Sequence, residues 1–183
     1  CAKRQINIFV EKPGSVCLEE AKLIEATIKK NNVDFFISFQ RNFHPLLKKM
    51  YELIICKEIG SIISVRVNVG SYVPDWHKYE SFYDLYACQK KLGGGVITTE
   101  CHELNTLLDL FGFPEKVYSS TNRRGEFDIS AEDSSSILMK YKNFCITVNL
   151  CFMQKMQERN FTIIGTDGYI KLDLVNQSIH YKT

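Results

Sequence analysis

Apolar residues follow two kinds of spacing along this chain, and the change between them divides it into two parts. Residues 5–10 and 34–39 are short apolar runs whose length and composition predict strands. Between these runs, apolar residues recur at helical spacing over residues 18–30, which predicts an amphipathic helix. A strand, a helix and a second strand in this order are typical of a parallel α/β sheet.

The pattern changes beyond residue 40. Pro45 suits the first turn of a helix that runs to about Cys56, and residues 59–69 are rich in β-branched side chains, as expected of a long strand. Helices are predicted over residues 79–91 and 100–111. The remaining predicted strands cover residues 116–121, 134–142, 144–152, 159–165 and 168–174.

Two turn signals join these later strands as hairpins. Asn143 makes one short turn, and Thr166-Asp167-Gly168 contains the Asp-Gly pair that favours another. Consecutive hairpins imply an antiparallel sheet, so the predicted fold class is α+β. We expect an open, mostly antiparallel sheet with helices on one face over residues 41–183, preceded over residues 1–40 by the end of an α/β domain.

Composition narrows the class of protein. Hydrophobic residues make up 45% of the chain and charged residues 24%, which predicts a soluble globular protein. The net charge is +2 and no basic block is present, so we expect neither a nucleic-acid nor a membrane partner. Seven cysteines without a CxxC pair are typical of reduced thiols, and no signal peptide is visible, which favours the cytoplasm. Because the chain begins at Cys1 and at once enters a strand, we expect a fragment.

A lysine follows the first predicted strand, in the tripeptide Glu11-Lys12-Pro13. Ligands of open α/β sheets bind at this end of the strands, and proline makes Lys12 leave the strand on a stiff turn. A lysine partly withdrawn from water can act as a general acid or base. The alternative is an ordinary surface lysine at a strand end.

A second cluster of candidate residues begins at Gly93-Gly94-Gly95, whose spacing is not that of a phosphate loop. In the helix that follows, one face is apolar and consists of Leu104, Leu107, Leu108 and Phe111. The opposite face carries His102, Asn105, Thr106 and Asp109. Because His102 lies in the first turn, the positive helix end favours a neutral imidazole that could act as a base. The alternative is a solvated polar face.

Five motifs occur in one order along the chain. They are Glu11-Lys12-Pro13, Phe39-Gln40-Arg41-Asn42-Phe43-His44-Pro45, Glu58-Ile59-Gly60, Gly93-Gly94-Gly95 with His102-Glu103-Leu104-Asn105, and Gly165-Thr166-Asp167-Gly168. In this order they resemble the glucose-fructose oxidoreductase, inositol dehydrogenase and rhizopine-catabolism (Gfo/Idh/MocA) family of NAD(P)-dependent sugar oxidoreductases. The resemblance covers nearly all 183 residues.

The resemblance implies a Rossmann domain for NAD or NADP, of which residues 1–40 are the last part, and a substrate-binding and oligomerisation domain over residues 41–183. Glu11, Lys12 and Pro13 would contact the cofactor. Lys12 would also reach the substrate, and His102 would give or take the proton as hydride passes to the nicotinamide.

Two further positions are compared with the family. Asn105 matches a substrate-facing polar position that is usually aspartate. Thr99 stands where the family often has aspartate. Thr99 cannot take a proton as a carboxylate does, so either Glu100 substitutes or the proton relay rests on Lys12 and His102 alone.

Residues 72–77 resemble a subgroup associated with surface-polysaccharide and acidic amino-sugar metabolism. Trp76 would offer a stacking face to a sugar, while neighbouring polar side chains, namely Asp75, His77 and Tyr79, could bond hydroxyls. The alternative is a core tryptophan. Arg41 is a candidate for binding a substrate carboxylate or phosphate, or else a structural ion-pair partner.

The predicted function is therefore an NAD(P)-dependent oxidoreductase acting on a hydroxyl or keto group of a sugar or nucleotide sugar, with the fragment itself inactive. Strands 134–142 and 144–152 carry apolar residues at both odd and even positions, so both faces of the sheet are partly apolar. This pattern predicts a homo-oligomer, a dimer or tetramer, through the outer sheet face. One alternative is a non-catalytic binding or assembly module. The candidate ligands of a metal hydrolase are His44, His77, Cys101 and His102. No two of them have the i, i+4 spacing of a zinc-binding helix, so a metal hydrolase is disfavoured and no metal site is expected.

Overall fold

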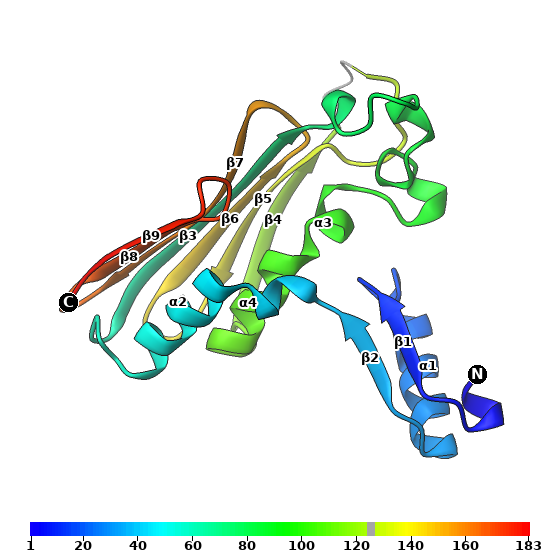
Figure 1. The fold of residues 1–183 in the computed structure, drawn as a ribbon, viewed down its shortest axis with the longest axis horizontal. Helices are drawn as coiled ribbons and strands as arrows, with labels where there is room; N and C mark the ends of the chain where they lie inside the picture. Colours follow the sequence, from blue (N-terminus) through cyan, green and yellow to red (C-terminus); the bar gives the residue numbers. More distant parts are fainter. Residues whose placement is uncertain (124–126) are drawn as a thin grey trace. The chain divides into compact units, whose positions relative to one another are not determined.

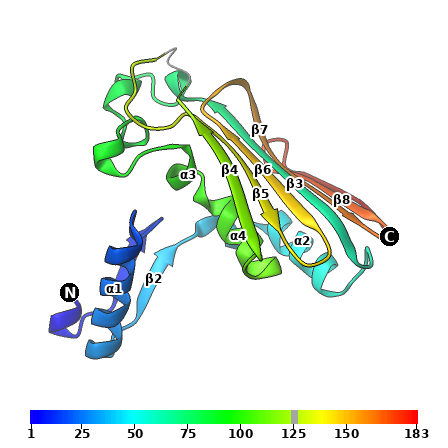
Figure 2. The same cartoon turned by 180° about the vertical axis from the view of Figure 1, so that it is seen from behind.

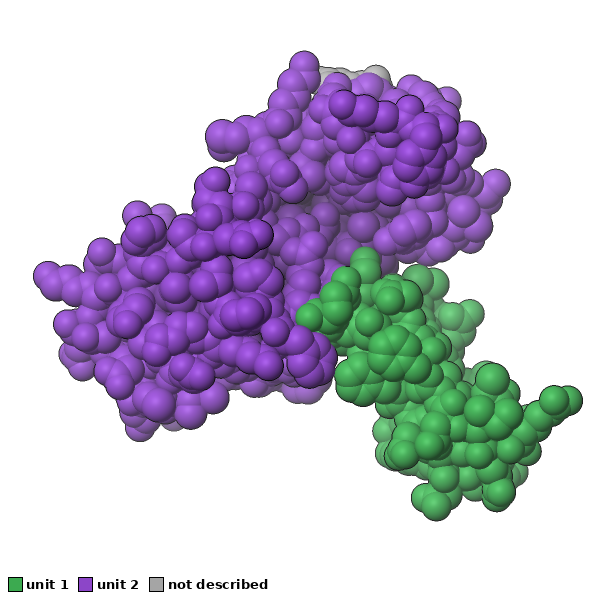
Figure 3. Space-filling model, viewed as in Figure 1, with its two compact units in different colours: residues 1–40 green, residues 41–183 purple. Residues whose placement is uncertain are grey.

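The computed structural model describes residues 1–123 and 127–183. Within them the chain forms two compact units, Cys1–Gln40 and Arg41–Thr183 (Figure 3). Each unit is considered by itself. That the first unit is the end of a nucleotide-binding domain stays a prediction.

The first unit is a strand–helix–strand motif. Strands β1 (Ile8–Glu11) and β2 (Phe35–Ser38) pair in parallel, and helix α1 (Leu18–Asn31) connects them (Figure 1). These elements confirm the predicted order, with both strands starting later than expected. No residue of α1 is buried, and a cavity of about 390 Å³ lies between apolar residues of α1 and β2. A parallel sheet is normally covered on both faces. The residues of this unit alone do not cover both faces of the β1–β2 sheet.

The second unit is built on one seven-stranded sheet in the order β4-β5-β6-β3-β7-β8-β9. Its strands are β3 (Ile62–Tyr72), β4 (Lys116–Asn122), β5 (Ser134–Lys140), β6 (Cys145–Cys151), β7 (Met153–Gly165), β8 (Tyr169–Asp173) and β9 (Ser178–Lys182). Only the central β3–β6 pair is parallel, and every other neighbouring pair is antiparallel. The predicted mostly antiparallel sheet is thus confirmed, and the sequence pattern missed β9.

Helices cover one face of this sheet. They are α2 (Pro45–Ile55), the single turn α3 (Val96–Thr99) and α4 (Cys101–Phe111), as Figures 1 and 2 show. Along β5 and β6 the inward positions are buried, whereas Leu138 is 37% exposed and Asn149 is exposed on the outer face. The outer face therefore mixes apolar and polar residues, and its predicted oligomer partner stays a prediction. No helix in the described ranges is long and apolar enough to cross a membrane.

The predicted helix over residues 79–91 is wrong. The chain forms three separate 3-10 turns there: Phe82–Asp84, Tyr86–Cys88 and Lys90–Leu92. The side-chain amide of Gln89 donates hydrogen bonds to the carbonyls of Tyr83 (3.2 Å) and Asp84 (3.0 Å). A continuing α-helix would use these two carbonyls for its own backbone.

The predicted helix over residues 100–111 is confirmed as α4, which begins one residue later, at Cys101. Glu100 has φ −99° and ψ 27°, which ends α3 and begins α4. Of the preceding glycines, Gly95 has φ +123°, and a Cβ there would lie 2.1 Å from the Glu132 carboxylate. The loop is thus packed against its own chain at this position, and a side chain is excluded there.

Candidate active site

The Lys12 turn lies at the C-terminal end of β1, as predicted. The Lys12–Pro13 peptide is cis, and the amide of Gly14 donates a 3.1 Å hydrogen bond to the carbonyl of Glu11, which closes the turn. Lys12 is half-buried. Because it belongs to the first unit and His102 to the second, their convergence on one site stays a prediction.

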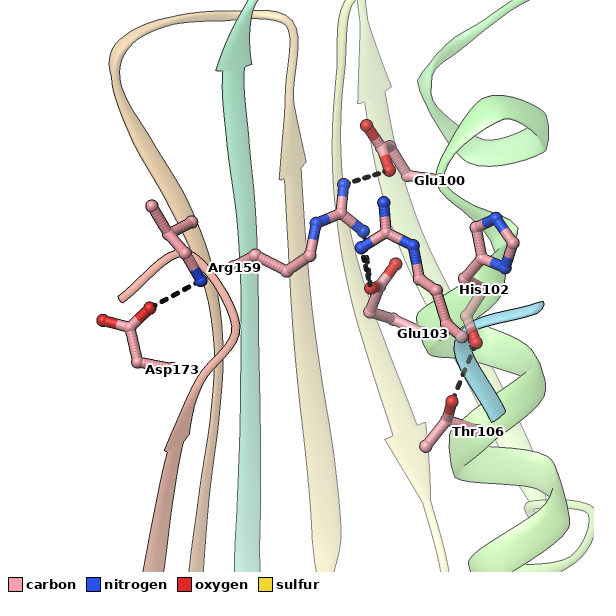
Figure 4. A network of polar contacts seen from close by, with 8 residues as sticks. Glu100, His102, Glu103, Thr106, Arg159 and Asp173 are labelled. Carbon is pink, nitrogen blue, oxygen red and sulfur yellow. Dashed lines mark hydrogen bonds and ion pairs between the residues drawn. The ribbon is translucent and has the colours of Figure 1, made fainter. Parts of the chain in front are cut away.

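A buried ionic cluster lies on the helix-covered face of the second unit's sheet. Arg159 of β7 extends from the sheet, and its two terminal nitrogens bind Glu100 at 2.5 Å and Glu103 at 2.6 Å (Figure 4). The three side chains are 12%, 7% and 2% exposed respectively. Charge-assisted bonds of this kind are strong, and they fix both carboxylates against the sheet.

Arg41 adds a second guanidinium to the same cluster. Its Nη1 lies 3.7 Å from Oε1 of Glu103, the oxygen that Arg159 also binds. The Arg41 side chain is 32% exposed, so it is the most accessible charge of the four. The cluster thus brings together two predicted site residues, Arg41 and Glu100.

The two oxygens of Glu103 have unequal surroundings. Oε1 faces both guanidiniums, while Oε2 is buried and has no hydrogen-bond partner among the described residues. Burial raises the pKa of Glu103, and Arg159 and Arg41 oppose that rise. Burial and the neighbouring Arg159 lower the pKa of Arg41, whereas for Arg159 burial is outweighed by Glu103 and Glu100, which raise its pKa.

His102 lies in the first turn of α4, as predicted, and is only 4% exposed. Its backbone carbonyl accepts a 3.0 Å hydrogen bond from the hydroxyl of Thr106. Figure 4 shows Glu103 directed towards the Arg159 guanidinium and the His102 ring lying apart from that pair.

The predicted division of α4 into an apolar and a polar face needs correction. The buried residues are His102, Glu103, Thr106 and Leu107, while Leu104, Leu108 and Phe111 are partly buried at the edge of the core. Arg159 explains the burial of Glu103, because it supplies a partner of opposite charge on the sheet. Of the predicted polar face, His102 and Thr106 are buried, Asn105 is half-buried and Asp109 is exposed.

Asn105 belongs to a neighbouring polar group. Its amide donates hydrogen bonds to Asp109 (3.0 Å) and Asn42 (3.4 Å), and Asn42 also donates to Asp109 (3.2 Å). A cavity of about 460 Å³ opens beside them, lined by Asn42, Lys48, Tyr51, Glu52 and Asp109. The hydroxyl of Tyr51 donates to the carbonyl of Thr106 at 3.2 Å, and burial together with Asp109 raises its pKa to about 12.

Trp76 is half-buried and packs edge-on against Phe152, with ring centroids 5.1 Å apart. Trp76 packs against the hydrophobic core as a partly buried residue, which is the structural role named as the alternative. Sugar stacking on its exposed surface stays a prediction. His77 and Tyr79 bond each other at 2.8 Å. Within the described ranges, no group of three or more His, Cys, Asp or Glu side chains is arranged to hold a metal ion.

Sequence reasoning missed Glu103 and Arg159. A signal for Arg159 exists, because it occupies an inward position of β7 opposite Val69 and two residues before buried Phe161. A charged residue at an inward position requires a buried partner of opposite charge. The partner itself, Glu103, could not be named from spacing along the chain.

Comparison with known proteins defines the family. The model of the GFO/IDH/MocA C-terminal domain matches residues 47–171. The chain belongs to this family. It is 24% identical over 173 residues to the trans-1,2-dihydrobenzene-1,2-diol dehydrogenase of Xenopus tropicalis, covering 94% of this chain and 50% of that protein. The chain thus spans about half the length of this relative, and the predicted resemblance is confirmed.

Solved structures of a dehydrogenase and an oxidoreductase share the fold. The WlbA dehydrogenase from Bordetella pertussis, determined with NADH and UDP-GlcNAcA, has a TM-score of 0.86 and 24% identity, covering 98% of this chain and 56% of that one. An NAD binding oxidoreductase from Klebsiella pneumoniae has a TM-score of 0.84 and 16% identity, covering 98% and 51%. At these identities the likeness establishes the fold class.

Proposed function

We propose that the protein containing this chain is an NAD(P)-dependent oxidoreductase acting on a hydroxyl or keto group of an acidic sugar or nucleotide sugar. The observation that carries this proposal is family membership together with His102 in the first turn of α4 and Lys12 at the end of β1. The B. pertussis neighbour, which contains NADH and UDP-GlcNAcA, supports the substrate class.

The residues present fit the edge of a dinucleotide site. Parallel strands β1 and β2 are the type of sheet at whose carboxyl ends nucleotides bind, and Glu11, Lys12 and Pro13 follow β1 at that end. The glycine-rich GxGxxG spacing that holds a pyrophosphate is not found in the 183 residues. A bound nicotinamide would supply the hydride acceptor.

The proton chemistry is assigned to Lys12 and His102. Oxidation of a carbinol releases a hydroxyl proton, and a neutral imidazole at His102 accepts it while the Lys12 ammonium stabilises the developing charge. Proton transfer of this kind contributes about 10²- to 10⁴-fold in rate. Arg41, with its accessible guanidinium, binds the acidic group of the sugar.

The test uses the full-length protein. Lys12→Ala and His102→Ala should each abolish turnover of UDP-GlcNAcA, followed by absorbance of the reduced nicotinamide, and leave NADH binding intact. Lys29→Ala is the control, because Lys29 is exposed and pairs with Glu25 on the same helix. Wild-type rates in either site variant would overturn the assignment.

A non-catalytic assembly module is the second candidate. Glu100, which could replace the missing aspartate at Thr99, is already bound to Arg159 at 2.5 Å. This observation favours a chain that keeps the fold without a complete proton relay. NADH binding without turnover of any acidic or neutral nucleotide sugar would support this candidate.

We also infer a homo-oligomer through the outer sheet face. Tyr118 and Leu138 are 55% and 37% exposed there, beside a shallow cavity of about 420 Å³. Exposed apolar side chains beside a hollow are typical of association surfaces. A monomeric full-length protein in light scattering at micromolar concentration would contradict this inference.

A further inference from the structure

The cluster of Arg41, Glu100, Glu103 and Arg159 is balanced in charge when both glutamates are ionised. Two guanidiniums face two carboxylates, and each terminal nitrogen of Arg159 already binds one carboxylate at 2.6 Å or less. Arg41 differs, since its single partner is 3.7 Å away and its side chain is 32% exposed. Arg41 is therefore the member with donors to spare for an incoming anion.

An anion bound at Arg41 would unbalance this cluster. The added negative charge would lie on the guanidinium that helps to neutralise Glu103, and it would compete with Glu103 for that guanidinium. A like charge close to a buried carboxylate favours the protonated form of the carboxylate. Protonation of one carboxylate would restore the balance of charge.

Glu103 has the position to do so. Its Oε1 is turned to both guanidiniums, while its Oε2 is buried without a hydrogen-bond partner within residues 1–123 and 127–183. A proton on Oε2 would leave the bond from Arg159 to Oε1 in place. Glu100 differs, because its Oε2 accepts a hydrogen bond of 2.5 Å from Arg159.

We infer that Glu103 is a charge-adjusting residue of the substrate site, which takes a proton from solvent onto Oε2 when an anionic group of the substrate binds Arg41. One O–H bond forms and no other bond changes. The inference rests on the proposed function, because it takes the acidic sugar as the ligand. Glu103 acts through Arg41 and does not touch the substrate. In the free protein its carboxylate pairs with the Arg41 guanidinium, and once protonated it leaves the positive charge of Arg41 to the bound anion.

The surroundings of Glu103 support the direction of this effect. The charged groups that face it are Arg159 from β7, Arg41 from the turn before α2, and Glu100 from the start of α4, with His102 its neighbour on its own helix. Burial already raises the pKa of Glu103 before any anion binds. A negative charge added at Arg41 would act in the same direction, because it too disfavours the ionised carboxylate.

Calorimetric titration of the full-length protein tests the inference. UDP-GlcNAcA and the neutral-sugar analogue UDP-GlcNAc are each titrated in buffers of different ionisation enthalpy, which gives the protons taken up per ligand bound. The wild-type protein should take up about 0.5 to 1 proton with the acid, and Glu103→Gln close to none. Uptake with the acid alone assigns the anion to the sugar carboxylate, and equal uptake with both ligands assigns it to the diphosphate.

Glu158→Gln is the matched control. Glu158 precedes Arg159 on β7 but points to the opposite sheet face, where it accepts hydrogen bonds from Asn68, Gln154 and Asn160. Its substitution should leave the proton uptake unchanged. A second measurement needs no variant: from about pH 6 to about pH 8, the Kd of the wild type for the acid should rise about three- to tenfold per pH unit.

The outcomes separate this inference from the proposed function. Turnover of the acid with no proton uptake, or with equal uptake in wild type and Glu103→Gln, overturns the inference and leaves the oxidoreductase assignment standing. Proton uptake that depends on Glu103, without turnover of the acid, supports the inference and overturns the oxidoreductase assignment. Failure of both ligands to bind overturns the inference together with the proposed substrate class.

Discussion

Replacing Arg159 with methionine removes the cation that binds both buried carboxylates of the cluster. Methionine keeps an unbranched side chain on the inward side of β7 and makes no ion pair. Glu100 then loses its 2.5 Å partner, and Glu103 keeps only Arg41 at 3.7 Å. Both carboxylates are less than a tenth exposed, so water cannot replace the lost partner.

The expected loss follows from this burial. Removing one partner of a buried ion pair costs about 3–5 kcal/mol, because the remaining charge is left uncompensated. Neutralising both carboxylates removes that charge, so the triple variant Arg159→Met, Glu100→Gln, Glu103→Gln should recover more than half of the lost stability. The deficit of the single variant should also shrink as the pH falls, since the unpaired carboxylates then take up protons.

Urea unfolding measures these differences, with fluorescence of the single tryptophan as the signal. Trp76 packs on Phe152 and therefore reports on the second unit. Lys29→Met serves as the control, because it breaks the exposed ion pair with Glu25 and should leave the unfolding curve unchanged. A midpoint for Arg159→Met equal to that of the wild type, or a triple variant less stable than the single one, would refute the reasoning.

Three further predictions concern the second unit. Tyr51→Phe should lower the free energy of unfolding by about 1 kcal/mol, because the hydrogen bond to Thr106 is lost. The raised pKa of Tyr51 contributes stability that is present below pH 10.0 and lost as the pH rises through about 12. The variant should therefore lack this alkaline loss in unfolding curves. Gly95→Ala should cost about 1–3 kcal/mol in thermal unfolding, since φ +123° is unfavourable for any side chain; an unchanged Tm would contradict this. Leu138→Lys should make the full-length protein monomeric in light scattering without altering its circular dichroism, and an unchanged oligomer would show that the outer face is not the interface.

The fold was largely predictable from the sequence because its elements follow local rules. The parallel β1–β2 unit, the hairpin turn at residues 166–168 and the mostly antiparallel sheet all appear as expected. The helix over residues 79–91 was wrong because one side chain, Gln89, takes the carbonyls that a helix would need. The spacing of apolar residues along the chain does not reveal that a side chain competes with the backbone for these carbonyls.

The site was predictable only where single elements define it. Lys12 and His102 could be placed at a strand end and in a first helical turn, since those positions depend on nearby residues alone. The partnership of Arg159 and Glu103 joins residues 56 positions apart, and no local pattern encodes it. This partnership changed the expected burial of α4, because the ion pair allows Glu103 to be buried against the sheet together with Leu107.

A crystal structure of the full-length protein with NADH and UDP-GlcNAcA is the most direct test of the proposed active site. The account predicts that Lys12 Nζ and the His102 imidazole both lie within hydrogen-bond reach, about 3 Å, of the sugar oxygen that reacts, on the side facing the nicotinamide. Lys12 and His102 on separate faces of the molecule, or His102 sealed away from the bound sugar, would contradict it.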